Sequence, residues 1–475
     1  MTKRKFTDLL GDRAFWRTTA RLAIPIALQN LLISSFALVD TVMVSQLGGV
    51  ELSATGMAGQ WVWLLNIFLF GAASGGAVFI SQYWGVNDRK GIHRVMGISF
   101  LVVAVFLLPF FLIPLISPTL VLSFFTKEAE VVAVGSRYIA IALWSYPAIA
   151  INSVVSNVLR STEHVKLPMA VSFVTTVLNG VLNACLIFGL GPFPQMGVEG
   201  AAVATVVSAW AGPVLLIVIS LLQKNILRAS PRDVFCIPKS ECRAFFKRSA
   251  PAAFNEILWG AGTLVINLIY SNISAEMFGG VTILRSVENI AFAFIQGLGA
   301  ACCVLVGKTV GSGQIREAIR DARRFGILVP LFSVVLGVSV ILARPLLIAL
   351  FNFSGTLSEL TLETAYGVLL IYGLEIAMRN IPYIQVVGIY RSGGDTFTAA
   401  IFDIGCLWLL SIPATALAAY LGAPFLLVFA ITYMVEDWPK CVCCLIHFRR
   451  GGWIKPVTEE GRAGLEAYRA ELAAK

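Results

Sequence analysis

The sequence predicts an all-α integral membrane protein with twelve transmembrane helices in two six-helix lobes. Three observations support this fold class. Of the 475 residues, 57% are hydrophobic and only 13% are charged, so that no soluble domain could bury the apolar surface and keep a solvated exterior. Apolar runs long enough to cross a bilayer recur along the chain. Basic residues gather in alternate gaps between these runs.

Twelve apolar runs have the length of a membrane-spanning helix, which is about 20 residues. They lie near residues 22–45, 54–81, 95–118, 138–158, 168–190, 201–222, 249–271, 281–306, 325–349, 365–390, 398–420 and 424–447. We expect no cleavable signal peptide. The first run is too long for one, lacks a small-residue cleavage site and contains Asp40.

The lysine and arginine residues are distributed unevenly between these runs. Most lie in the N-terminal segment, in the gaps after the second, fourth, sixth and eighth runs, and in the C-terminal tail. Because basic loops stay in the cytoplasm, this bias predicts a multi-pass protein of the plasma (inner) membrane with both termini cytoplasmic. It also explains the net charge of +9. We therefore expect the lipid bilayer, and no nucleic acid, as a partner.

The two halves of the chain repeat weakly at a fixed offset. Pro25 and Pro251 lie just inside the first span of each half, and Gly85 and Gly311 each end a second span before a basic loop. Two halves of the same orientation imply a pseudo-two-fold axis along the membrane normal, and in transporters such halves enclose a central site. We predict an N-lobe over 1–221, a cytoplasmic linker over 222–248, a C-lobe over 249–448 and a cytoplasmic tail over 449–475.

Several carboxylates inside the spans have a basic residue three or four positions away on the same helix. Such a partner matters because a charge near the bilayer centre costs about 2.5–3.5 kcal/mol. The expected pairs are Glu375 with Arg379, Glu436 with Lys440, and Glu288 with Arg285. We expect these pairs to be structural. Asp395 lies in a glycine-containing turn and is expected to cap a helix or to stabilise the turn.

Three other carboxylates, Asp40, Glu256 and Asp403, have no partner on their own helix. Counted from the basic end of its span, Asp40 lies about 30 Å along the helix, whereas Glu256 lies only about 12 Å along its own. An unpaired carboxylate at such a depth either carries a proton or binds a cation, and a coupling site needs one of these properties. The alternative is an interhelical salt bridge or hydrogen bond, and for Asp403 this alternative is the favoured one.

Uncharged polar residues accompany these carboxylates. Asn179 and Asn183 are four positions apart in the fifth span, and Thr205 lies in the sixth. Carbonyl and hydroxyl oxygens beside one carboxylate would suit a hard monovalent cation. Ordinary helix–helix hydrogen bonding explains the same spacing and is the favoured alternative. The run from Gly200 to Thr205 is also expected to form a small-residue packing face.

Several motifs together resemble the multidrug and toxic compound extrusion (MATE) family over essentially the whole chain. They are Leu38 to Gly48, Gln82 to Gly85, Arg160-Ser161, the stretch from Leu178 to Gly189, Gly200 to Thr205, and Arg391 to Thr396. The resemblance implies a cation-coupled secondary antiporter that exports amphipathic, often cationic, drugs or metabolites. It also implies alternating access between two lobes and small organic molecules as substrates.

The resemblance also assigns residues by position. Asp40 matches the acidic residue of the family's N-lobe, with Asn179 and Thr205 as its neighbours, and Glu256 matches an acidic residue that some members use in the C-lobe. Two positions depart from the pattern. Asn183 stands where some members have a second N-lobe aspartate, and Asn380 stands where others have an acidic residue in the tenth helix. Sodium and proton coupling are both open, and a C-lobe site would depend largely on Glu256.

Two other functions are alternatives to the antiporter. A lipid-linked precursor flippase of the same superfamily would need a strongly cationic central cavity. A membrane-embedded enzyme would need a nucleophile–base pair or a metal cluster at depth, but the three histidines lie in or beside basic loops. No phosphate-binding glycine loop is present, so ATP is not the expected energy source. We expect a monomer that is not an enzyme and has no cofactor beyond its coupling ion.

Overall fold

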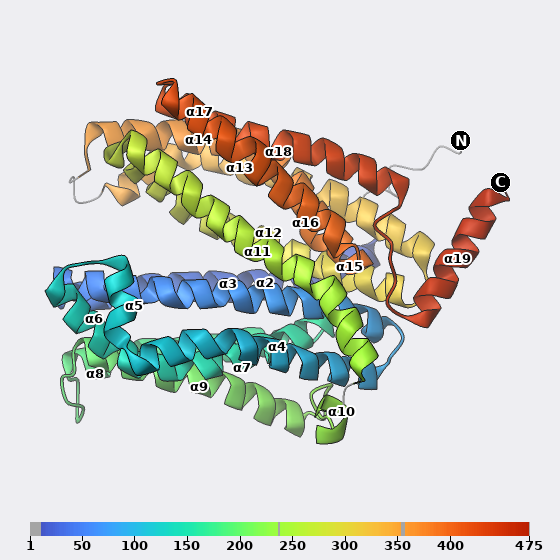
Figure 1. Ribbon diagram of the computed structural model, residues 1–475, viewed down its shortest axis with the longest axis horizontal. Helices are drawn as coiled ribbons and strands as arrows, with labels where there is room; N and C mark the ends of the chain where they lie inside the picture. Colours follow the sequence, from blue (N-terminus) through green and yellow to red (C-terminus); the bar gives the residue numbers. More distant parts are fainter. Residues whose placement is uncertain (1–10, 236–237, 353–356, 475) are drawn as a thin grey trace. The chain divides into compact units, whose positions relative to one another are not determined.

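The computed structural model describes residues 11–235, 238–352 and 357–474, and these residues are almost entirely helical (Figure 1). The helices of the first half are α2 (Arg13–Ser45), α3 (Gly49–Gly85), α4 (Arg89–Ile116), α5 (Pro118–Phe125), α6 (Ala129–Ala142), η1 (Leu143–Ser145), α7 (Tyr146–Ser161), α8 (Lys166–Phe188), α9 (Val198–Leu222) and α10 (Pro231–Phe235). Those of the second half are α11 (Lys239–Ile273), α12 (Ala275–Gly311), α13 (Ile315–Phe351), α14 (Glu359–Tyr383), η2 (Ile384–Tyr390), α15 (Arg391–Gly393), α16 (Thr396–Gly405), η3 (Cys406–Ser411), α17 (Ile412–Tyr420), α18 (Phe425–Arg450) and α19 (Glu459–Ala473).

Eleven helical segments of the described chain are long and apolar enough to cross a membrane. Three of them join consecutive elements without a break: α6 with η1 and α7, α14 with η2 and α15, and α16 with η3 and α17. The twelfth expected span is α18, which differs from the others because Glu436, Asp437 and Lys440 lie in its middle. Helices satisfy their own backbone polar groups, which is why they can cross lipid. The predicted all-α membrane fold is confirmed.

Short polar side chains begin several of these helices. Asp88 caps α4 by accepting a hydrogen bond from the Gly91 backbone N–H at 2.9 Å. Asp395 caps α16 in the same way, since its carboxylate accepts from the backbone N–H of Thr398 at 3.4 Å. The predicted role of Asp395 as a cap is therefore confirmed. At the C-terminus of α8, Gly189 ends the helix with a φ of 71°, which a glycine adopts without strain.

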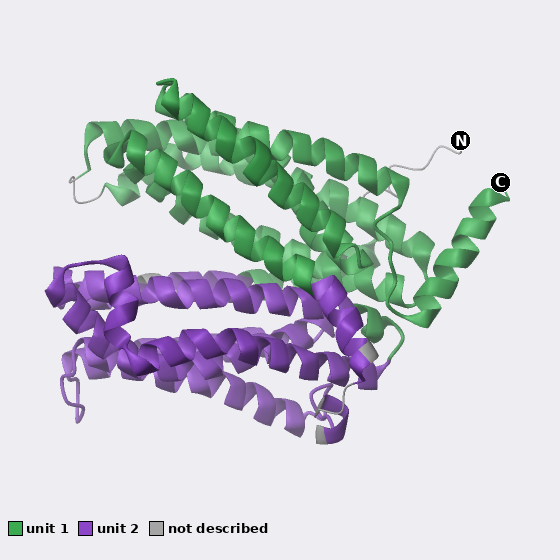
Figure 2. Ribbon diagram, viewed as in Figure 1, with its two compact units in different colours: residues 1–27, 81–87, 250–475 green, residues 28–80, 88–249 purple. Residues whose placement is uncertain are grey.

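The described chain forms two compact units (Figure 2). Unit 2 comprises residues 28–80 and 88–249, and unit 1 comprises the described parts of 1–27, 81–87 and 250–475. α2 and α3 each contribute one end to unit 1 and the remainder to unit 2, whereas α11 contributes its first residues, up to Ser249, to unit 2 and the remainder to unit 1. The lobe boundaries expected from the sequence stay a prediction.

Each unit has its own apolar core. In unit 1 the core is rich in aromatic side chains: the ring of Tyr270 lies 5.6 Å from that of Phe425 and 5.7 Å from that of Phe429. In unit 2 a smaller cluster joins three helices through Val44 of α2, Ile187 of α8 and Ala201 of α9. Each residue of this second cluster lies one helical turn from a polar residue of its own helix: Asp40, Asn183 or Thr205.

Small residues set the closest approaches between helices. A methyl group at Gly200 would lie 2.6 Å from the carbonyl oxygen of Leu186, so α9 and α8 touch backbone to backbone. The neighbouring Ala201, Ala202 and Ala204 are buried. The small-residue packing face predicted for the sixth span is confirmed, and it brings the polar side chains of α8 and α9 together.

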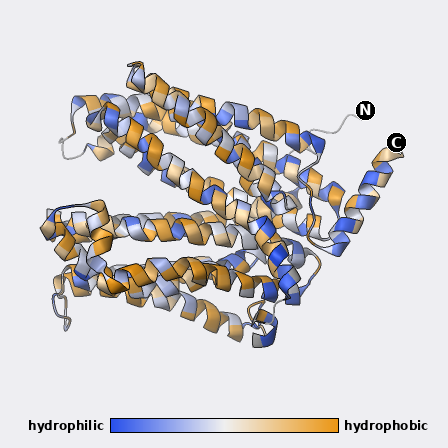
Figure 3. Ribbon diagram, in the orientation of Figure 1, coloured by the Kyte–Doolittle hydropathy of each residue, from blue (hydrophilic) through white to orange (hydrophobic). Residues whose placement is uncertain are grey.

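Large apolar side chains remain exposed along the long helices. On α4, for example, Val105, Leu108 and Leu112 are 65%, 54% and 43% exposed. Figure 3 shows hydrophobic residues along much of the long helices and many hydrophilic ones in α19. Such an exposed apolar surface is unsuited to water and suits contact with lipid.

The segment after α18 folds back onto unit 1. Trp453 is only 1% exposed, the backbone N–H of Lys455 donates to the carbonyl oxygen of Gly393 at 2.7 Å, and the Thr458 hydroxyl donates to that of Gly311 at 2.6 Å. α19 then continues beyond Thr458, which caps it. The C-terminal tail is therefore an ordered part of unit 1.

Candidate functional site

The carboxylate of Asp40 lies on α2, within unit 2, and is partly buried. The side-chain amide of Asn183, on α8, donates to its Oδ1 at 2.5 Å. The side-chain amide of Asn179 is oriented so that both its nitrogen and its oxygen have hydrogen-bond partners. Its nitrogen donates to the two carboxylate oxygens of Asp40 at 3.0 and 3.1 Å, and its oxygen accepts from the Ser208 hydroxyl at 3.1 Å. The spacing of four residues puts both asparagines on one face of α8, and that face is turned toward Asp40.

Thr205 reaches this group of residues through a tyrosine. Its hydroxyl donates to the carbonyl oxygen of Ala201, on its own helix, at 2.9 Å. The side chain of Tyr138, on α6, lies near the Thr205 side chain and near Asp40. We call these six residues the Asp40 cluster: Asp40, Tyr138, Asn179, Asn183, Thr205 and Ser208.

The Asp40 cluster contains no basic side chain. In the part of the chain that the structure describes, no Lys, Arg or His lies within ion-pair distance of Asp40. In addition, the Oδ1 atom of Asn183 is buried and has no hydrogen-bond partner. Carboxylate, amide and hydroxyl oxygens thus converge on a place where a negative charge is not neutralised. Such a set of oxygens can hold a proton or a hard monovalent cation.

Glu256 has a different environment. It lies on α11 in unit 1, and its Oε1 atom is 2.7 Å from the guanidinium of Arg391 on α15. The side chain of Arg391 is only 2% exposed. The interhelical salt bridge considered as the alternative for Glu256 is therefore present in this structure.

Asp403 is also paired between helices. The ammonium group of Lys440, on α18, lies 2.8 Å from its carboxylate, and the amide of Asn255, on α11, donates to it at 2.9 Å. Asn380 lies elsewhere in unit 1, where its amide donates to the hydroxyl of Ser333, on α13, at 2.9 Å. Asp403 thus has the interhelical partner that was favoured for it, and Asn380 joins α14 to α13.

Comparisons with known proteins agree with this architecture. The family model MatE matches residues 25–185 and 251–417, one segment in each half of the chain. The chain belongs to the MatE family of multidrug efflux transporters. The resemblance read from the motifs is confirmed, and the two matched segments begin at Pro25 and Pro251, the residues that mark the internal repeat.

Relatives of this MatE chain cover nearly all of its length. It is 26% identical over 437 residues to "Probable multidrug resistance protein NorM" of Thermotoga maritima, with 92% of each chain covered. It is 22% identical over 417 residues to "Probable multidrug resistance protein YoeA" of Bacillus subtilis, with 86% and 88% covered. Among solved structures, "Crystal structure of MATE in complex with MaL6" has a TM-score of 0.81 at 17% identity, with 98% of each chain covered. That likeness supports the MATE fold.

The pairs expected along single helices in this MatE chain are only partly correct. Arg285 with Glu288 (2.8 Å) and Lys440 with Glu436 (2.9 Å) are confirmed. The pair of Glu375 with Arg379 is wrong, because Arg379 crosses from α14 to Glu288 on α12 at 3.1 Å. Glu375 instead accepts a hydrogen bond from the indole N–H of Trp438 at 3.1 Å. Glu288, the more deeply buried of the two carboxylates, thus pairs with Arg379 as well as with Arg285, because an uncompensated buried charge is costly.

Two members of the Asp40 cluster, Tyr138 and Ser208, were missed in the sequence. Both lie inside apolar runs rich in similar residues, and no pattern along the chain distinguishes Tyr138. Ser208 is one turn from Thr205 on α9, so a search for polar residues at three- and four-residue spacing would have found it. Tyr138 comes from another helix, α6, and only the packing of that helix against α9 places it in the cluster.

Proposed function

We propose that this protein is a cation-coupled secondary antiporter that exports amphipathic, often cationic, compounds. In the proposed orientation both termini are cytoplasmic, the protein acts as a monomer, and sodium ions or protons drive transport. Asp40 is the proposed coupling residue, with Asn179, Asn183 and Thr205 as its polar neighbours. The observation that carries the proposal is a partly buried carboxylate, inside a membrane span, that hydrogen-bonds with neutral groups and has no basic partner among the described residues. The names of the NorM and YoeA relatives, which are multidrug resistance proteins, support an exported drug as cargo.

The geometry suggests how cation binding could change the Asp40 cluster. Ionised Asp40 accepts hydrogen bonds from the amides of Asn183 and Asn179. A proton on Asp40 turns one oxygen into a donor, so this oxygen no longer accepts equally well and the amides lose part of their interaction. A sodium ion would instead lie against the carboxylate and the unpartnered Oδ1 of Asn183. Either cation removes the cost of an isolated charge and so shifts the balance between two packings of α2 and α8.

A C-lobe contribution from Glu256, Asn380 and Asp403 also belongs to this proposal. Because Glu256 and Asp403 each have a basic partner, a substrate or cation would have to compete with Arg391 or Lys440 for them. The N-lobe site is therefore the stronger candidate for coupling.

The flippase alternative is less favoured by the charges of unit 1. Five buried or half-buried basic side chains in the spans there lie against a carboxylate: Arg285, Arg324, Arg379, Arg391 and Lys440. Neutralised in this way, they do not form the strongly cationic surface that a lipid-linked pyrophosphate would need.

Transport in proteoliposomes tests the proposal. Purified protein is reconstituted, and efflux of ethidium, a lipophilic cation, is followed while a sodium gradient and a pH gradient are imposed separately. We expect one of the two gradients, or both, to drive ethidium against its own gradient. Ethidium movement that neither gradient accelerates would contradict cation coupling.

A further inference from the structure

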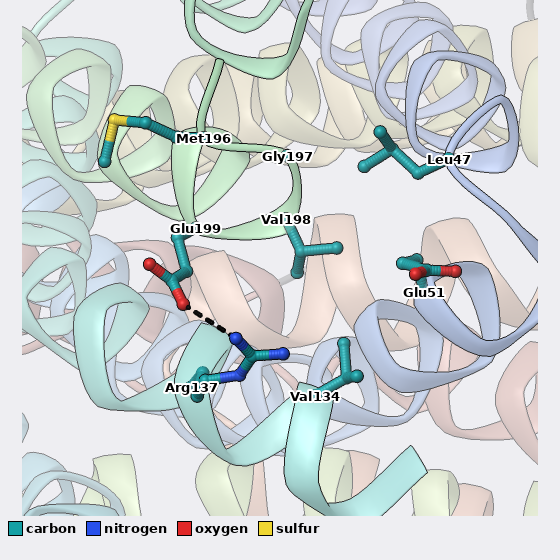
Figure 4. A pocket seen from close by; sticks show the side chains of 8 residues that line it. All are labelled: Leu47, Glu51, Val134, Arg137, Met196, Gly197, Val198 and Glu199. Carbon is teal, nitrogen blue, oxygen red and sulfur yellow. Dashed lines mark hydrogen bonds and ion pairs between the residues drawn. The ribbon is translucent and has the colours of Figure 1, made fainter. Parts of the chain in front are cut away.

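A small hollow opens at one end of unit 2 (Figure 4). Its volume is about 170 Å³, and it lies between the turn that joins α2 to α3, the start of α3, helix α6, and the segment that leads into α9. The lining residues are Leu47, Glu51, Val134, Arg137, Met196, Gly197, Val198 and Glu199. This end of unit 2 is opposite to the basic gaps of the first half, so the proposed orientation places it outside the cell.

The charges that line the hollow do not cancel. Arg137 lies 3.3 Å from Glu199, and Glu51 lies on the other side of the hollow (Figure 4). Within the described chain, Glu51 has no basic side chain within ion-pair distance, so two carboxylates face one guanidinium. The Arg137 side chain is 66% exposed, which makes its pair with Glu199 weak and easily screened. The hollow therefore carries a net negative charge.

An apolar layer separates this hollow from the Asp40 cluster. The layer consists of Val44, Ile187 and Ala201, with exposures of 6%, 0% and 5%. Leu47 and Tyr138 pack against it, Leu47 from the hollow and Tyr138 from the Asp40 cluster. A layer with so little exposure is closed to water in this structure.

The hollow, the layer and the Asp40 cluster lie in register along the same helices. Each layer residue is four positions from a cluster residue: Val44 from Asp40, Ile187 from Asn183, and Ala201 from Thr205. The hollow begins seven positions from the cluster along the chain, at Leu47, two residues past the end of α2, and at Val198, the first residue of α9. Along α9, at 1.5 Å per residue, this separation is about 10 Å. One helical turn of apolar packing is thus all that separates the negative hollow from the unpaired carboxylate.

The size of the hollow decides which ligand fits. At about 30 Å³ per water molecule, a volume of 170 Å³ holds a handful of waters. Pockets for drug-sized molecules measure about 300–1,000 Å³. A small hydrated cation therefore fits here, and an amphipathic drug does not.

We propose that this hollow is the outer vestibule of the coupling cation. Glu51 and Glu199 raise the local concentration of protons or sodium ions, and the layer of Val44, Ile187 and Ala201 is the gate between the vestibule and Asp40. The second observation that points to a cation is the Oδ1 atom of Asn183, which is buried and unpartnered on the far side of the gate. This inference rests on the proposed function, because it needs a coupling cation that reaches Asp40 from outside.

The experiment measures how the external cation concentration controls transport. Ethidium transport by reconstituted full-length protein is recorded at low ionic strength over a series of external pH values and, separately, of sodium concentrations. For Glu51→Gln combined with Glu199→Gln we expect the half-saturating cation concentration to rise by about two- to ten-fold at an unchanged maximal rate. The difference should shrink at high ionic strength, because salt screens exposed charges. Glu130→Gln, which removes an exposed carboxylate of α6 outside the hollow, is the matched control.

The outcomes separate the two proposals. If neither gradient drives the wild-type protein, the proposed function fails. If gradients drive the wild type and not Asp40→Asn, but the double variant behaves as Glu130→Gln does, the vestibule alone is overturned.

The gate has an independent readout: Ile187→Ala should increase passive cation flux without ethidium, and flux equal to that of the wild type would contradict a gate at this layer. Glu51→Gln alone, which breaks no ion pair, keeps the test valid if the double variant is unstable.

Discussion

Gln82 and Ser392, 310 positions apart in the chain, are joined by a hydrogen bond of 2.8 Å between the Gln82 side-chain amide and the Ser392 carbonyl oxygen. The same glutamine accepts a hydrogen bond from the backbone N–H of Val457 at 2.7 Å. One buried side chain thus connects the end of α3, the short helix α15 and the C-terminal tail. The tail is not needed to cross the membrane, and Gln82 gives it a fixed place in unit 1.

Gln82→Leu should lower the stability of the protein by about 2–6 kcal/mol, because two buried backbone groups lose their partners at about 1–3 kcal/mol each. Leucine has nearly the same volume, so the change tests hydrogen bonding more than packing. Thermal unfolding in detergent measures the effect. Gln60→Leu, at an exposed position of α3, is the control, and equal Tm values for the two variants would contradict the prediction.

The tail has a second anchor that should respond to pH. Burial raises the pKa of Asp395, but hydrogen bonds from Lys455, Thr398 and His447 outweigh burial and leave the pKa below its usual value. A carboxyl group with a lowered pKa in the folded state contributes stability above its unfolded pKa, about 4, and loses this contribution as the pH falls through the folded value. We therefore expect Asp395→Asn to be less stable than the wild type at pH 7, with the difference shrinking below about pH 4.

Unfolding temperatures of both proteins between pH 7 and pH 3 measure this dependence. Glu466→Gln, which changes an exposed carboxylate of α19, is the control for the general effect of acid. A stability difference between Asp395→Asn and the wild type that stays constant over this range would show that the carboxylate charge is not what anchors the tail.

The Asp40 cluster could be partly predicted from the sequence. An acidic residue inside an apolar run is rare enough to identify Asp40, and the four-residue spacing of Asn179 and Asn183 places both on one face of a helix. Which helix that face meets is decided by packing, here by the close approach of α8 and α9 at Gly200. Contacts from a third helix, such as that of Tyr138, therefore have no signal in the sequence.

Pairing between distant helices could not be predicted for a related reason. Charges three or four positions apart can be paired from spacing alone, and Arg285 with Glu288 is correct. Arg379, however, had a carboxylate at the right spacing and yet pairs with Glu288 on another helix. The choice depends on which carboxylate is more deeply buried, and a linear sequence does not contain that information.

Asp40→Asn should abolish gradient-driven efflux and leave expression and Tm close to those of the wild type. An amide is cheaper than a carboxylate inside the membrane, so folding does not suffer, but it cannot exchange a proton and binds a cation weakly. Ethidium efflux from cells and from proteoliposomes measures the loss. Glu130→Gln should retain full efflux, and full efflux by well-expressed Asp40→Asn would exclude the coupling role.

The last prediction separates two roles for Glu256. Its partner Arg391 is 2% exposed, so Glu256→Gln leaves a guanidinium buried without its counter-charge. Breaking one side of a buried ion pair costs about 3–5 kcal/mol, whereas removing both charges is often neutral. We therefore expect Glu256→Gln to lower Tm strongly and Glu256→Gln combined with Arg391→Met to recover most of the loss.

Transport by the stable double variant then shows whether the carboxylate has a further task. If Glu256 attracts cationic substrates, the double variant should bind ethidium more weakly than it binds a neutral amphipathic compound, whereas Asp40→Asn should reduce transport of both. If the pair is structural only, the double variant should transport both compounds as the wild type does. A single Glu256→Gln protein with unchanged Tm would contradict the structural pair itself, because a buried guanidinium that loses the Glu256 counter-charge should destabilise the fold.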